Sequence, residues 1–247
     1  MDPFCWNEPP PAELRTANLV LSLEPNEDGV RYAIRTHDNT WLGSVVLVPG
    51  GEHRANIVYS TPAHAAEAVA AIAELAARTS QLRWLQLVCV NTAKADVARQ
   101  LGFSRTNGSV WTADCDDLLA WHHVRSIAVA ANANVKVAGD AGAIVVHAPD
   151  GVELELSIAS ASDQPYVTAT TPIGSTDVFP PDDSLAHTSN LVVGALAVRD
   201  EQLELRYGCA PSGFTAKCLA LLLHEAARLR ALIPSRTILP DAFACAL

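Results

Sequence analysis

The sequence predicts an α+β protein built from two units, and three observations support this fold class. Strand-length apolar runs separated by turn residues recur through most of the 247 residues. Helical patterns lie between such runs in the first half, and a long amphipathic helix follows several hairpins in the second. We therefore expect a mixed-sheet unit at residues 1–113 and a smaller unit of antiparallel sheet plus helix at residues 114–247. A single composite sheet is the alternative.

The first elements are strands. Apolar residues of strand spacing occupy residues 18–23, 31–35, 41–48 and 55–59. The second and third of these runs are separated by His37-Asp38-Asn39-Thr40. Because Asp and Asn side chains favour tight turns, we expect these two strands to form a hairpin.

A helix is expected next, from Thr61-Pro62 to about Arg78. Threonine followed by proline is typical of an N-cap and a first helical position. Glu67 and Glu74 would lie on its polar face. Its apolar face would comprise Ala65, Val69, Ile72 and Ala76.

The segment from Leu82 to Phe103, LRWLQLVCVNTAKADVARQLGF, predicts a buried strand, a capped helix and a stop. The apolar run through Leu85, Leu87 and Cys89 has strand length. Asn91 is a good N-cap, since its side chain can accept a hydrogen bond from an amide of the first turn. Gly102 ends the helix, and residues 109–113 close the unit as a strand. The helix face would comprise Ala93, Val97 and Leu101.

The second half predicts a meander, a hairpin and a long helix. The meander strands are expected at residues 132–137, 143–147, 152–158 and 166–170, and residues 171–190 as loop with one short helical turn. A hairpin follows, formed by residues 192–198 and 202–207. The helix spans about residues 213–232, with Ser212 as its N-cap and Pro234 after its end.

Composition excludes several classes of partner and compartment. The net charge is −10, and no basic patch is present, so nucleic acid and an anionic membrane are not expected as partners. The first residues, MDPFCWNEPPP, do not resemble a secretory signal, and no apolar run has membrane-spanning length. The six cysteines are scattered without a C-x-x-C pair, as in buried thiols of a cytoplasmic protein.

The strand, Asn-capped helix and Gly-Phe of residues 82–103 resemble the acyl-CoA-binding core of the GNAT N-acetyltransferase superfamily, in the branch that acetylates ribosomal-protein N-termini. The resemblance covers about residues 14–111. It implies a mixed sheet with helices on both faces, in which pantetheine lies between two diverging parallel strands. It also implies a glycine-rich basic loop that binds pyrophosphate at a helix N-terminus.

Three departures from the family pattern concern this chemistry. The loop YSTPAHAAE, residues 59–67, contains neither Gly nor Arg, so His64 is its only plausible cation. The connection between residues 23 and 31 is too short for the helices that form the family's acceptor wall. Ala98 occupies the position of a Tyr that often protonates the departing thiolate.

The resemblance leaves four candidate cofactor-binding residues and no assignable catalytic residue. The four are Asn91, Tyr59, Thr61 and His64. Asn91 also has a purely structural interpretation as a helix cap. We expect no cofactor if the chain is not an enzyme, and acetyl-CoA if it is. Glu67 or Glu74 would then be a possible general base.

Two further groups contain reactive residue types. Asp114-Cys115-Asp116-Asp117 and His122-His123 include metal ligands, but their spacing favours an acidic helix start, and no metal is expected. Asp183, Ser184 and His187 include the residue types of a hydrolase triad without the G-x-S-x-G turn around the serine. The sequence GCAPSG at residues 208–213 is not that turn either.

The hairpin GALAVRDEQLELRY, residues 194–207, and the helix after it resemble YbjN-like and type III secretion chaperone-like domains. IVVHAPDGVELELSI, residues 144–158, resembles their opening meander. This resemblance implies dimerisation or client binding.

The leading hypothesis is a non-catalytic protein-binding or regulatory protein, chaperone-like, on a degenerate GNAT-like scaffold, with a protein partner or a homodimer. One alternative is an active N-acetyltransferase that uses acetyl-CoA and an amine. Another is a sensor of an acyl-CoA or other small ligand.

Overall fold

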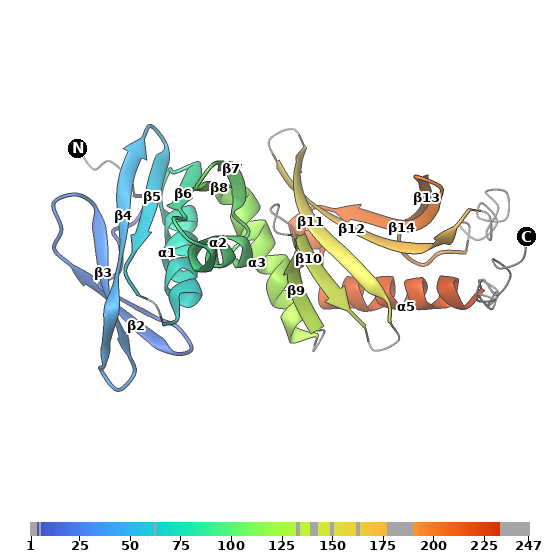
Figure 1. Cartoon of the computed structure of the whole chain (residues 1–247), viewed down its shortest axis with the longest axis horizontal. Coiled ribbons are helices and arrows are strands. Elements are labelled where there is room, and N and C mark those ends of the chain that lie inside the picture. The colour runs from blue at the N-terminus through green and yellow to red at the C-terminus, as the bar shows by residue number, and fades with distance from the viewer. Residues whose placement is uncertain are drawn as a thin grey trace, which may run out of the picture.

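The computed structural model describes residues 4, 6–61, 63–131, 134–138, 143–148, 151–161, 164–176 and 190–232. Its strands form two separate sheets rather than one composite sheet, one of eight strands and one of six. Helix α3, Cys115–Ala130, lies between the two sheets (Figure 1). The mixed α and β content and the smaller antiparallel second sheet agree with the expected fold class.

The eight-stranded sheet has the order β1-β2-β3-β4-β5-β6-β8-β7. All its neighbours are antiparallel except β5 and β6, which are parallel. The strands are β1 Glu13–Arg15, β2 Leu19–Glu24, β3 Val30–Thr36, β4 Trp41–Gly51, β5 Arg54–Tyr59, β6 Trp84–Val88, β7 Ser104–Asn107 and β8 Val110–Asp114. The expected strands are present, while β1 and β7 were not predicted.

Helices cover one face of this sheet. Helix α1, Ala65–Thr79, and helix α2, Thr92–Gln100, lie on the same side as α3 (Figure 1). The other face leaves apolar side chains exposed, including Trp41 at 62%, Val58 at 53% and Val88 at 50%. The expected helices on both faces are therefore not found in the described residues, because residues 25–29 between β2 and β3 form a short non-helical connection.

The six-stranded sheet is antiparallel throughout, in the order β13-β14-β12-β11-β10-β9. A 3-10 turn, Pro211–Gly213, leads into helix α5, Ala216–Leu232. The strands are β9 Asn134–Ala138, β10 Ala143–His147, β11 Glu153–Ala161, β12 Gln164–Ser175, β13 Ala195–Arg199 and β14 Gln202–Cys209. No helix of the described residues is long and apolar enough to cross a bilayer.

Helix α3 belongs to both hydrophobic cores. Cys115 and Leu118 pack in the core of the first sheet, with Tyr32, Leu85 and Phe103. One turn further along, α3 places Trp121, Val124 and Ala128 in the core of the second sheet. The proposed unit boundary at residue 113 stays a prediction, since the helix that follows it serves both cores.

The N-terminal ends of the helices can be compared with the predicted cap residues. Asn91 is confirmed, because its side-chain oxygen accepts a hydrogen bond from the Lys94 amide at 2.9 Å. Thr61 is not the cap of α1: the cap position is His64, with φ 55°, and the Thr61 hydroxyl donates to the Ala63 carbonyl instead. The prediction that Ser212 caps the last helix, α5, is also wrong.

Ser212 lies inside the 3-10 turn, and the hydroxyl of Thr215 accepts the hydrogen bond from the Cys218 amide at 3.2 Å. Pro62 and Pro234, the triad types Asp183, Ser184 and His187, and most of the expected loop at residues 171–190 lie outside the described residues.

Candidate functional site at the divergence of β5 and β6

The only parallel strand pair of the described residues creates the candidate site. The β5–β6 ladder runs from Arg54 opposite Trp84 to Ile57 opposite Leu87. Beyond it, Tyr59 pairs with β4, whereas Val88 pairs with β8. The two carboxyl ends therefore diverge, and each leads into a helix. The crevice at the carboxyl ends of parallel strands is a common ligand position.

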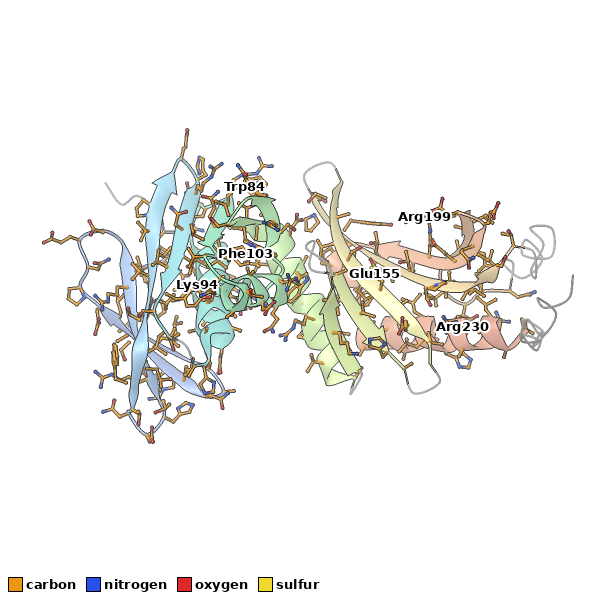
Figure 2. All side chains as sticks on the ribbon, viewed as in Figure 1. Trp84, Lys94, Phe103, Glu155, Arg199 and Arg230 are labelled. Carbon is orange, nitrogen blue, oxygen red and sulfur yellow. The ribbon has the colours of Figure 1, made fainter. Side chains whose placement is uncertain are left out.

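Tyr59 is the central buried polar residue at this point. Its ring is covered by Lys94 of α2, which is labelled in Figure 2. The ammonium nitrogen of Lys94 lies 4.8 Å from the ring centroid. Its hydroxyl is buried and has no hydrogen-bond partner among the described residues. Burial, and secondarily the neighbouring Cys89, raises the pKa of Tyr59 to about 12. The phenol is therefore neutral at physiological pH.

Cys89 lies beside this tyrosine and is buried. Its thiol donates to the Lys94 carbonyl at 3.4 Å. Burial raises the pKa of the Cys89 thiol, and the Lys94 charge opposes this effect only in part. Because a thiolate is needed for nucleophilic attack, Cys89 does not have the properties of a reactive cysteine.

The loop before α1 does not fit a pyrophosphate group. His64 Nδ1 lies 3.4 Å from a carboxylate oxygen of Glu67. Burial tends to raise the pKa of Glu67, but hydrogen bonds from Thr16 and Asn18 lower it overall, so Glu67 is ionised. Its negative charge already complements the positive end of the α1 dipole and would repel phosphate.

The structure brings only part of the predicted set together. Tyr59 and Asn91 lie at the ends of the diverging strands, while Thr61 and His64 belong to the loop before α1, where the Thr61 hydroxyl is occupied by Ala63. The role of all four as cofactor ligands stays a prediction. The neighbours Cys89 and Lys94 were not predicted, because only Asn91 at the turn between β6 and α2 gave a local signal.

The candidate metal ligands have other contacts. Asp114 caps α3 by accepting from the Asp116 amide at 2.9 Å, and Asp117 accepts from the Ser160 hydroxyl at 2.8 Å. His123 Nε2 lies 3.1 Å from the Phe214 carbonyl oxygen. Within the described part of the chain no three His, Cys, Asp or Glu residues converge as a metal site requires. The possible base Glu74 is paired with Arg78 at 2.8 Å.

Among the described residues, helices cover only the inner face of the second sheet, and β13 and β9 are its edge strands. Helices α3 and α5 pack against its inner face, and Figure 2 shows Arg199 on β13 and Arg230 on α5 on opposite sides of the sheet. The outer face contains a depression of about 450 Å³. Its lining includes Glu155, Tyr166, Thr168, Thr170, Arg199 and Arg206. Strand β13 is at the edge, and no strand of the described residues pairs with its outer side.

Comparison with solved structures finds seven similar chains, which include members of two complexes. The complex of ExsC with ExsE matches with a TM-score of 0.38 and 13% identity, over 49% of this chain and 98% of the other. The HopA1–SchA chaperone–effector complex matches with a TM-score of 0.39 and 12% identity, over 48% and 98%. Both TM-scores are below 0.5, so neither likeness carries an argument about function. No protein-family model and no curated protein matches the chain.

Proposed function

We propose that this chain is a non-catalytic, chaperone-like protein that binds an extended segment of a protein partner along β13, on a scaffold whose first half is a degenerate GNAT-like domain. The observation that carries the proposal is the accessible edge of the six-stranded sheet. An edge strand presents main-chain donors and acceptors that pair readily with another strand.

Apart from the charge of Arg199 at its end, strand β13 lacks the usual protection against such pairing. Its sequence is ALAVR, which contains no Pro and no Lys, and it has no bulge in its ladder with β14. Val198 is 51% exposed, and Val192 just before the strand is 70% exposed. Such apolar side chains beside an open edge would contact the alternate side chains of an added strand.

The chemistry of the first half supports a non-catalytic role. At the divergence of β5 and β6, the Cys89 thiol and the Tyr59 phenol are both held in their neutral forms. The first turn of α1 carries the Glu67 carboxylate where a phosphate-binding site needs positive charge.

The test is site-specific photo-crosslinking in cells that express the protein. A photoreactive residue at Val198 should capture one defined protein, and the same residue at Val58, equally exposed on the first sheet, should not. The purified partner should then bind the chain, and Val198→Lys should weaken binding at least tenfold while Val58→Lys leaves it unchanged. Equal affinities for the two variants would contradict the proposal. Crosslinking of one copy to another would identify a homodimer, to be confirmed by light scattering.

A second candidate function is N-acetyl transfer from acetyl-CoA to an amine, and the diverging parallel strands with the unpartnered Tyr59 hydroxyl favour it. In that case pantetheine would pair with β5 near Asn91. Calorimetric titration with acetyl-CoA, with CoA and desulfo-CoA as controls, tests this. Micromolar binding that Asn91→Ala abolishes without unfolding would support the transferase; saturable binding without transfer would support an acyl-thioester sensor. The absence of any binding heat with acetyl-CoA would exclude both the transferase and the acyl-thioester sensor.

A further inference from the structure

A cavity lies away from the divergence of β5 and β6, beside α1. It has a volume of about 720 Å³, within the range of small-molecule sites. The β1–β2 turn, α1, the C-terminal end of α2 and α3 surround it. We call it the α1–α3 groove. Its lining includes Leu14, Ala66, Ala70, Ala71, Leu75 and Leu101.

These residues give the groove an apolar wall. Ala66 and Ala70 are four residues apart and share one face of α1. Ala71 lies next round the helix and also lines the groove, so three small side chains border it. Because alanine fills little volume, this face leaves space that Leu14 and Leu75 border. An aliphatic body placed there would be stabilised by the removal of its apolar surface from water.

Two residues of α3 that line the same groove, His122 and Arg125, each have a buried nitrogen atom without a partner among the described residues. The Nε2 atom of His122 and the Nε atom of Arg125 are buried and make no hydrogen bond among the described residues. The two residues are three apart on α3 and therefore lie on the same side of the helix. A buried donor without a partner is destabilising. A carboxylate that enters the groove deeply enough to accept from Arg125 Nε and from the Nε2–H tautomer of His122 would relieve this cost.

The carboxylates near the groove already have partners. Glu74 is paired with Arg78, and Glu67 accepts from the backbone and side chain of Asn18. Within the described residues Arg125 has no ion pair; its guanidinium lies 5.6 Å from the ring centroid of Trp121. Arg125 is thus a cation available to an anionic ligand, and its planar donors match a carboxylate.

We propose that the α1–α3 groove binds a small organic carboxylate, with the carboxylate at His122 and Arg125 and an aliphatic body along the alanine face of α1. This site is independent of the partner edge at β13 and of the diverging strands. The proposed carboxylate also differs in chemistry from the ligands of those two sites, which are a protein strand and acetyl-CoA.

Calorimetric titration of the full chain with octanoate tests the proposal, with 1-octanol as the neutral probe of the same length. Octanoate should bind saturably and at least tenfold more tightly than octanol. Arg125→Gln should weaken octanoate binding at least tenfold. The control Arg54→Gln changes an exposed arginine that does not line the groove and should have no effect.

A second measurement does not depend on the stability of any variant. Titrating the wild-type protein with octanoate should shift the imidazole ¹⁵N resonance of His122 with the same dissociation constant as the calorimetry. Equal binding of octanoate and octanol, an unchanged His122 resonance, or undiminished octanoate binding by Arg125→Gln would overturn the proposal.

Discussion

Thr171 illustrates how a single buried polar atom affects stability. This residue of β12 is fully buried on the inner face of the second sheet, and its hydroxyl has no hydrogen-bond partner among the described residues. Replacing it by the isosteric valine removes the unsatisfied hydroxyl while keeping the volume. We therefore expect Thr171→Val to raise the free energy of unfolding by about 1 kcal/mol, measured by urea denaturation.

Thr168 on the same strand provides the matched control. Its hydroxyl is 2.7 Å from the hydroxyl of Ser157, so Thr168→Val breaks a hydrogen bond. That variant should lower the free energy of unfolding by about 1 kcal/mol. A stabilising Thr168→Val, or a destabilising Thr171→Val, would contradict this assignment.

His122 makes stability depend on pH. Burial lowers the pKa of His122, with smaller opposing effects from Glu74 and further lowering by Arg125 and Arg78. Below about pH 6.5 the unfolded histidine binds a proton that the native one does not, so stability falls as the pH decreases from there towards the native pKa. The loss is at most about 1.4 kcal/mol for each pH unit.

Urea midpoints measured at pH 7.5 and pH 5.5 test this effect. His122→Gln should flatten the decrease between the two pH values, because the titrating group is absent. The exposed His37 is the control, and His37→Gln should leave the decrease unchanged. If both variants lose as much stability between pH 7.5 and pH 5.5 as the wild type does, His122 does not cause the pH dependence.

At the scale of elements, Gly102 allows α2 to end against α3. Its φ is +83°, and a Cβ atom would lie 2.7 Å from Cγ of Trp121. Gly102→Ala therefore combines a left-handed backbone cost with a steric clash, and we expect a loss of about 2–4 kcal/mol of stability. Gly108 has φ +51° and open space around it, so Gly108→Ala should cost only about 1 kcal/mol. Thermal unfolding of both variants measures the difference, and equal losses would exclude the clash with Trp121.

The elements that sequence could predict are those with a strong local pattern. Residues 143–147 coincide with β10, and the Asn91 cap is confirmed, since apolar alternation and capping are determined by neighbours in sequence. Strands β1 and β7 have the sequences ELR and SRTN, without an apolar signal, and exist through pairing with β2 and β8. Thr61 matched the cap pattern, but its hydroxyl bonds within the loop.

The sites were less predictable because they depend on contacts through space. Lys94 covers Tyr59 only because α2 follows the strand beside β5, and no spacing in the sequence indicates that contact. The α1–α3 groove likewise requires α1, α3 and the β1–β2 turn to come together. The alanines of α1 gave only an amphipathic pattern, whereas the space beside them results from helix packing.

At the scale of the whole molecule, α3 couples the two sheets. Leu118 is fully buried in the first core, and Val124, less than two turns away, is fully buried in the second. A helix of 16 residues has little stability without tertiary packing, so unfolding of one core removes support from the part of α3 that serves the other. We therefore expect the two sheets to unfold together.

Two probes separate the sheets in a urea titration. Hydrogen exchange of β3 and β4 reports on the first core, to which Tyr32, Ile34, Val45 and Leu47 belong. Hydrogen exchange of β11 and β12 reports on the second. The two midpoints should coincide, and Leu118→Ala, which costs about 2–5 kcal/mol at a buried leucine, should lower both equally. Leu222→Ala in the second core should do the same. If Leu118→Ala lowered only the midpoint of β3 and β4, α3 would not couple the sheets, and a partner bound at β13 could not stabilise the first sheet.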